Sequence, residues 1–192
     1  NGKNLFYNDG LINVTYNCVR LNIEKGLGNK IAIIYFDENG ITNKITYNQL
    51  ENLINHFINL FLKRFNIKNI KKKIIAIHSS ANLCSSISML ALAKLGITFN
   101  VIFNDLPKEA IKSRLKILKS QILITSCNND DFKSKIKPIE KECGLKILRF
   151  AKDLKKNDIF FALKGKKRDG NNYVKEAITN GASIAVVNKF QK

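Results

Sequence analysis

The sequence predicts an α/β fold in which a mostly parallel sheet is covered by helices on both faces. Short apolar segments of about four to seven residues alternate with longer segments whose apolar residues recur every three or four positions. The first pattern is typical of buried strands and the second of amphipathic helices, and their alternation favours parallel strands joined by helical crossovers. With 192 residues, 45% of them hydrophobic, the chain can bury a substantial core.

The elements follow one another along the whole chain. The expected strands are 31–36, 41–46, 73–78, 97–103, 121–125, 145–150, 159–163 and 183–187. The expected helices are 47–65, 81–95, 107–118, 131–143 and 170–180. The first two strands form a hairpin or two separate short strands, with the turn DENG between them. The last strand, helix and strand form a small βαβ unit at the C-terminus, whose two strands are expected to be parallel.

Capping signals fix several helix ends. Thr46 and Gln49 have the spacing of a capping box at the start of the first long helix. Ser80 is expected to cap the helix over 81–95, and Gly96 to end it. Within the first helix, apolar residues at three-and-four spacing predict its core face. They are Leu50, Leu53, Ile54, Phe57, Ile58 and Phe61.

The net charge of +18 raises the possibility of nucleic-acid binding, because Lys and Arg displace counterions from phosphates. The lysines are scattered, however, and accompany many Asn, Ile and Phe residues, a mixture that an AT-biased coding sequence would produce. The densest run, 68–74, is expected to be a solvated turn. A basic nucleic-acid-binding protein is therefore the third of three functional hypotheses.

The cysteines indicate the cellular compartment of the chain, and its longest apolar run indicates whether it crosses a membrane. Cys18, Cys84, Cys127 and Cys143 show neither CxxC pairing nor metal-ligand spacing, so no metal site is expected. Unpaired thiols without a signal peptide favour a cytoplasmic protein. The longest apolar run, 87–103, contains Lys94 and Gly96, which argues against a membrane span.

A nucleophilic site can be imagined from the histidines and two serines, but no catalytic residue is assigned. His78 precedes Ser79 and Ser80, and His56 lies on the first long helix. No G-x-S-x-G elbow surrounds the serines. The expectation is therefore structural, with the histidines at the surface and Ser80 as a helix cap.

Several segments in order carry a resemblance to a known family. They are LINVTYNC, GNKIAIIY, ITYNQL, SMLALAKLGITFNVIF and EAIKSRLKILKSQILIT. Together they make residues 4–142 resemble the N-terminal part of AMP-forming short-chain acyl-CoA synthetases, the acetyl- and propionyl-CoA synthetase group. The resemblance implies a ligase that converts a carboxylate, ATP and CoA to acyl-CoA, AMP and pyrophosphate, with Mg as a further cofactor. It also implies small-molecule substrates.

The same resemblance suggests a CoA contact. In the family a basic loop after the QILIT strand contacts the CoA phosphates, and the nearest matches are Lys133 and Lys135. Asp130 and Asp131 weaken that positive field. The chain also departs from the family where His78-Ser79 replaces a Met-Pro turn. Paired glycines after the VIF strand are replaced by Asn104 and Asp105, and an acidic-Arg-His trio by Arg20-Leu21-Asn22.

Missing segments limit the expected activity. Adenylation needs a Ser/Thr/Gly-rich loop that cradles ATP phosphates, ribose-binding acidic and Arg residues, and a late lysine at the carboxylate. The sequence contains no such loop and no such late segment. The chain alone is therefore expected to be inactive and to need no cofactor.

The C-terminal segment KNDIFFALKGKKRDGNNYVKEAITNGASIAVV resembles a second family. Residues 149–188 resemble the N-terminal domain of Mur ligases, which holds UDP-N-acetylmuramoyl-peptide. The residues that contact the sugar nucleotide in that family match Lys166, Lys167 and Arg168. The family's Asp-Ser-Arg triplet is replaced by 150–152, Phe-Ala-Lys, which removes a ligand-binding hydroxyl. A sugar-nucleotide-binding module of cell-wall synthesis is thus the alternative function.

The two resemblances predict two parts, 1–145 and 146–192. Gene decay, a fusion of truncated frames or a misjoined sequence would each explain the junction. The sequence leaves acyl-chain specificity and oligomeric state open.

Overall fold

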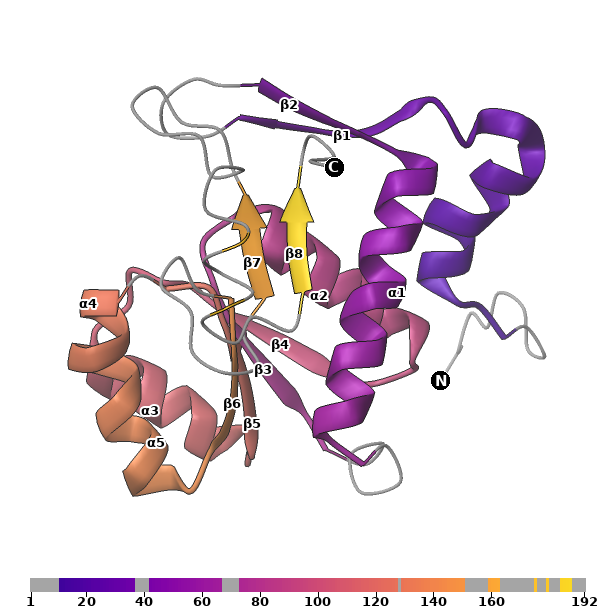
Figure 1. Ribbon diagram of the computed structural model, residues 1–192. Coiled ribbons are helices and arrows are strands. Elements are labelled where there is room, and N and C mark those ends of the chain that lie inside the picture. The colour runs from indigo at the N-terminus through magenta and orange to yellow at the C-terminus, as the bar shows by residue number, and fades with distance from the viewer. Residues whose placement is uncertain are drawn as a thin grey trace.

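The computed structural model describes residues 11–36, 42–66, 73–127, 129–150, 159–162, 175, 179 and 184–187 (Figure 1). The helices are η1 (Tyr16–Arg20), η2 (Ile23–Leu27), α1 (Tyr47–Arg64), α2 (Leu83–Lys94), α3 (Lys108–Ile117), α4 (Asn129–Asp131), η4 (Phe132–Ile136) and α5 (Lys137–Cys143). The strands are β1 (Ile31–Phe36), β2 (Thr42–Thr46), β3 (Ile75–His78), β4 (Phe99–Ile102), β5 (Ile122–Thr125), β6 (Lys146–Arg149), β7 (Ile159–Ala162) and β8 (Ile184–Val187).

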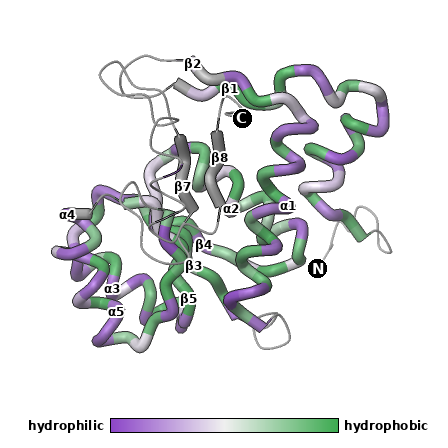
Figure 2. The backbone as a smooth tube through the Cα atoms, viewed as in Figure 1, coloured by the Kyte–Doolittle hydropathy of each residue, from purple (hydrophilic) through white to green (hydrophobic). Residues whose placement is uncertain are grey.

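A four-stranded parallel sheet forms the centre of the fold, with the strand order β4-β3-β5-β6. Strands β3 and β5 are buried along their whole length, and Figure 2 shows them as hydrophobic. Fully buried strands are expected when helices cover both faces of a parallel sheet. The predicted fold class is therefore confirmed.

Two hydrophobic clusters lie on the two faces of this sheet. The first packs α1 and α2 against β3 and β5, with Phe57, Leu92 and Ile77 among its buried residues. The second packs α3, η4 and α5 against the other face. Phe150, just after β6, stacks on Phe57 with ring centroids 5.4 Å apart. This contact joins the chain around 150 to the first cluster.

Helix α1 begins at the predicted residue with the predicted cap and ends one residue before the predicted end. The Gln49 N–H donates to Thr46 Oγ1 at 3.3 Å, and the Thr46 N–H donates to Gln49 Oε1 at 2.9 Å, which completes the capping box. Of the predicted core face, Leu50, Ile54, Phe57 and Phe61 are buried, and Leu53 and Ile58 pack against the same cluster.

Helix α2 corrects one prediction and confirms another. Its N-cap is Asn82 and not Ser80: Asn82 Oδ1 accepts the Ser85 N–H at 3.0 Å. Both residue types cap helices well, and here Asn82 has the extended backbone that places its side chain over the first turn. At the other end Gly96, with φ of +66°, terminates the helix as predicted.

The predicted helix over 131–143 begins two residues early and changes geometry within its length. The chain is helical from Asn129 to Cys143, as the successive segments α4, η4 and α5. The η4 turn has the wider hydrogen-bonding pattern of a π-helix. Pro138 follows it and lacks an N–H, so the regular i to i−4 ladder cannot continue through this point.

Two smaller sheets complete the described fold. Strands β1 and β2 pair antiparallel, which selects the hairpin from the two arrangements that the sequence left open. Strands β7 and β8 are parallel and in register, from Ile159 opposite Ile184 to Ala162 opposite Val187, which confirms the predicted pairing. Between them only Lys175 and Thr179 are described, both helical. The DENG turn, most of the 68–74 run and the rest of 163–183 lie outside the described residues.

Candidate functional site

The carboxyl end of the parallel sheet is the place where this topology favours a binding site. In open α/β sheets, ligands bind where the strand order reverses, because the connecting loops there diverge to opposite faces. The order β4-β3-β5-β6 reverses between β3 and β5. The segments that leave these strands, 79–82 and 126–127, therefore define the candidate site.

Neutral polar side chains connect these two segments. Ser79 Oγ lies 2.5 Å from Ser126 Oγ and donates to the Ser80 carbonyl at 2.9 Å. Asn82 Nδ2 donates to Ser126 Oγ at 3.1 Å and to Ser80 Oγ at 3.2 Å. Because Asn82 also caps α2, the cluster lies at the positive end of that helix.

A pocket of about 320 Å³ lies beside this cluster. Its apolar wall comes from β1, β4 and the residue after β4, and its polar side from the start of α2. The wall includes Ile34 and Phe103, which are 52% and 62% exposed. Apolar walls with a few convergent polar groups are typical of small-molecule sites.

His78 does not behave as the sequence predicted. Its side chain is completely buried, whereas a surface position was expected, and its Nδ1 lies 2.9 Å from Thr125 Oγ1. Burial lowers its pKa from 6.5 to about 4, with a further contribution from the positive charge of Lys135. The hydroxyl of Ser79 bonds Ser80, Asn82 and Ser126, so no His78–Ser79 pair forms. His56 is exposed on α1, as expected.

The predicted CoA-contact residues lie on the helical turn η4 and not on an open loop. Lys133 is exposed, whereas Lys135 forms an ion pair with Asp131 at 2.9 Å. Asp131 therefore weakens the positive charge of Lys135 through a direct contact, as the sequence suggested, and no such contact is found for Lys133 among the described residues. Lys166, Lys167 and Arg168 lie outside the described residues.

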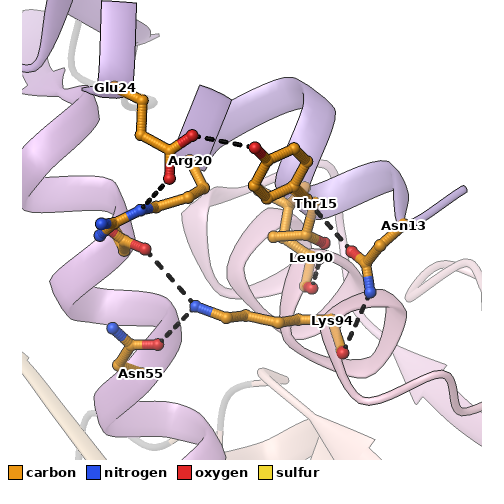
Figure 3. Close-up of polar contacts among 9 residues, drawn as sticks. Asn13, Thr15, Arg20, Glu24, Asn55, Leu90 and Lys94 are labelled. Atoms are coloured by element: carbon orange, nitrogen blue, oxygen red, sulfur yellow. Dashed lines mark hydrogen bonds and ion pairs between the residues drawn. The ribbon is translucent and has the colours of Figure 1, made fainter. Parts of the chain in front are cut away.

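A second polar cluster lies at the opposite end of α2 and was not predicted (Figure 3). Glu51 on α1 pairs with Arg20 at 3.3 Å and with Lys94 at 3.6 Å, and Arg20 also pairs with Glu24 at 2.9 Å. Hydrogen bonds from Arg20 and Tyr16 hold the pKa of Glu24 below its usual value. A pocket of about 520 Å³ opens here, but its charged groups pair with one another.

Two of the four cysteines are unsuited to nucleophilic chemistry. All four are free. Burial raises the pKa of Cys84 to about 12 and raises that of Cys127, so both thiols stay protonated at neutral pH. Among the described residues there is no group of three or more His, Cys, Asp or Glu side chains that could hold a metal. None of the described helices is both long and apolar enough to cross a bilayer.

Comparison with known proteins places the chain in a family. The family model described as AMP-binding enzyme matches residues 22–188. The acetyl-coenzyme A synthetases of Cupriavidus metallidurans and Helicobacter acinonychis are 31% and 34% identical over 121 residues, which is 63% of this chain and 18% of each relative. The aligned part thus amounts to less than a fifth of these relatives.

A solved structure agrees with the fold. The Brucella canis acyl-CoA synthetase superposes with a TM-score of 0.61 at 14% identity, over 77% of this chain and 26% of the other. The family model includes 149–188, for which the likeness to Mur ligases stays a prediction. This chain belongs to the AMP-binding enzyme family.

Proposed function

We propose that this chain is the N-terminal part of an acetyl- or propionyl-CoA synthetase. The observation that carries the proposal is the alignment of 121 residues with several acetyl-coenzyme A synthetases at 30–34% identity. The parent reaction joins a carboxylate to ATP as an acyl-adenylate and then transfers the acyl group to CoA. In this proposal the chain contributes three features to the enzyme: the parallel sheet, the pocket of about 320 Å³ beside its carboxyl end, and the η4 turn.

The residues present fit only part of the cofactor set. Lys133 is an exposed cation near the carboxyl end of the sheet, suited to a CoA phosphate. Lys135 contributes less, because Asp131 already neutralises it. For ATP and Mg the fit is poor: the sequence has no phosphate-cradling loop, and the described residues offer no cluster of metal ligands. We therefore propose that the chain alone does not form an acyl-adenylate.

Activity is tested with the purified chain, ATP, acetate or propionate, and CoA. The expected result is no release of AMP above the background without carboxylate. Steady AMP release that depends on the carboxylate would contradict the proposed inactivity, yet it would leave the family assignment intact.

CoA contact is tested separately by titration calorimetry. Lys133→Ala should weaken any CoA binding several-fold, and Lys135→Ala should weaken it less. Lys141→Ala, at an exposed lysine on α5, is the matched control and should change nothing. Equal effects of all three variants would mean that only overall charge matters, and the proposed contact would be wrong.

A second candidate function is a sugar-nucleotide-binding module in the C-terminal part. We propose that this part begins at residue 146, where the first resemblance gives way to the second. The parallel pairing of β7 with β8 favours a βαβ unit like that expected of a Mur ligase domain. Strand β6, just beyond this boundary, pairs with β5 of the central sheet, so the proposed boundary separates the two resemblances and not two separately packed cores. Titration with UDP-N-acetylmuramate is expected to show weak or no binding. Micromolar binding that is lost on changing Lys166 and Lys167 to Ala would instead favour the sugar-nucleotide module.

A further inference from the structure

Three buried polar residues form one row across the carboxyl end of the central sheet. His78 on β3 lies opposite Thr125 on β5, and Thr125 lies opposite Arg149 on β6. Their exposed fractions are 0%, 0% and 7%. Side chains alternate along a strand, so His78 shares the face of Ala76, which belongs to the second hydrophobic cluster. Polar groups thus end a sheet face that is otherwise apolar.

The hydrogen bonds of this row define the protonation state of His78. The Thr125 hydroxyl donates to Cys127 Sγ at 3.2 Å and accepts the Cys127 N–H at 3.3 Å. With its own proton used in this way, Thr125 Oγ1 accepts from Nδ1–H of His78 at 2.9 Å. Nε2 is then the basic nitrogen. It is buried and has no hydrogen-bond partner within 3.5 Å among the described residues, although the Asn104 backbone lies close enough to the ring to raise its pKa.

A proton on Nε2 would enter an unfavourable environment. Lys135 on η4 places a positive charge near the ring, and Asp131, the carboxylate that faces it, already pairs with Lys135. Arg149 is a second buried cation in the row. Burial raises the pKa of Cys127, which lies beside Thr125, and the charge of Arg149 lowers it in part. Helix α3 contributes the apolar residues Ile111 and Leu115 to this face. Burial and the charge of Lys135 therefore oppose the imidazolium while the site is closed, and they outweigh Asp131 and a hydrogen bond to the Asn104 backbone, which favour it.

The η4 turn forms part of the cover of this row. The Phe132 ring lies 4.1 Å from Arg149 Cζ, and Ile136 is completely buried in the second cluster. The turn also carries Lys135. We take this π-helical turn as the element of the cover that moves, because π-helical turns interrupt regular helices and often lie at functional sites.

We propose that His78 is an acid-sensitive latch that holds the 129–136 segment on the carboxyl end of the sheet. While the imidazole is neutral, the row is closed. When His78 takes up a proton, the segment moves away, and the imidazolium reaches water and gains distance from Lys135. This inference concerns the segment itself and holds whether or not Lys133 and Lys135 contact CoA.

The sign of the pH dependence follows from linkage. The closed state holds the pKa of His78 near 4, whereas a ring that reaches water has a pKa near 6.5. The open state therefore binds the proton first as the pH falls. Between pH 6.5 and pH 4 the opening equilibrium should rise about tenfold per pH unit, and it should level off below pH 4.

The test uses the full chain, which contains two histidines. NMR titration of the imidazole carbons follows both rings, with exposed His56 as the internal reference. Amide hydrogen exchange, corrected for the intrinsic pH dependence, follows opening of 130–136 against 50–61 in α1. The expected result is a late His78 titration, together with loss of protection in 130–136 at acid pH while α1 stays protected.

Two variants separate the latch from general acid sensitivity. His78→Asn keeps a donor toward Thr125 and cannot titrate, so it should remove the pH dependence of opening; His56→Asn should leave it unchanged. If His78→Asn does not fold, Lys135→Gln serves instead, because removing that cation should make the acid-induced opening at least severalfold smaller. An ordinary His78 titration would overturn the latch. So would simultaneous loss of protection in 130–136 and α1, or unchanged opening in both His78→Asn and Lys135→Gln.

Discussion

The two ends of helix α2 are held by different chemistry. At its start, neutral and partly buried groups surround Asn82, which caps the helix and also donates to Ser126. At its end, the N-terminal segment reaches across: Asn13 donates to the Ala93 and Lys94 carbonyls, at 3.3 and 3.2 Å. Thr15 donates to the Leu90 carbonyl at 2.6 Å, and Lys94 enters the ion-pair network of Figure 3.

This difference in chemistry predicts which end of α2 can bind a ligand and which end contributes more to stability. Charges that pair with one another at a solvent-exposed surface contribute little, because water screens them and long side chains lose entropy. Neutral groups at a helix start and a sheet end keep hydrogen-bonding capacity in a partly dry site. We therefore expect the start of α2 to respond more strongly to substitution than its end.

The largest effect is expected for Asn82→Ala. This change removes the cap of α2 and the hydrogen bonds to Ser79, Ser80 and Ser126, and it should lower the free energy of unfolding by about 2 kcal/mol. Urea denaturation measures it. Ser80→Ala, at the cap position that the sequence suggested, is the control and should cost less than about 0.5 kcal/mol. The reverse order would contradict the assigned cap.

The next effect concerns the turn at the end of α2. Gly96 has φ of +66° and no atom within 4 Å of where a Cβ would stand, so Gly96→Ala should cost about 1.5 kcal/mol through backbone strain alone. Lys119 adopts φ of +50° at the end of α3, in the same kind of turn. Lys119→Gly should therefore stabilise, by about 0.5–1 kcal/mol. Thermal unfolding of the two variants must move in opposite directions.

A smaller effect is expected where the N-terminal segment contacts α2. Thr15 is 2% exposed, and Thr15→Val keeps its shape while removing the hydrogen bond to Leu90. The expected loss is about 1 kcal/mol. Amide exchange should show the loss first in η1 and the end of α2. An unchanged exchange pattern there would mean that the hydroxyl does not hold this segment.

The smallest effect is expected for Glu51→Gln. It removes two ion pairs at once, yet both partners are at least one-third exposed, and Arg20 keeps its pair with Glu24. Any loss of stability should be smaller than for the other variants and should vanish at about 0.5 M salt. A large loss that persists in salt would show that the network holds the end of α2 as firmly as Asn82 holds its start.

The sequence predicted local features well and long-range placement poorly. The capping box of α1, the Gly96 stop and the strand–helix alternation depend on residues a few positions apart, and all were confirmed. The cap of α2 was misplaced by two residues, because Ser80 and Asn82 are both good cap residues. Only the backbone at the end of β3 selects between them.

For the candidate site the division is similar. The sequence by itself determined the α/β class, the chemical types of residue after β3 and β5, and the resemblance to acyl-CoA synthetases. The tertiary structure decided that His78 is buried beside Thr125 and that Ser79 meets Ser126, because these pairs are 47 residues apart. Such contacts depend on the order in which strands far apart in the chain lie side by side, which the pattern within each strand does not specify.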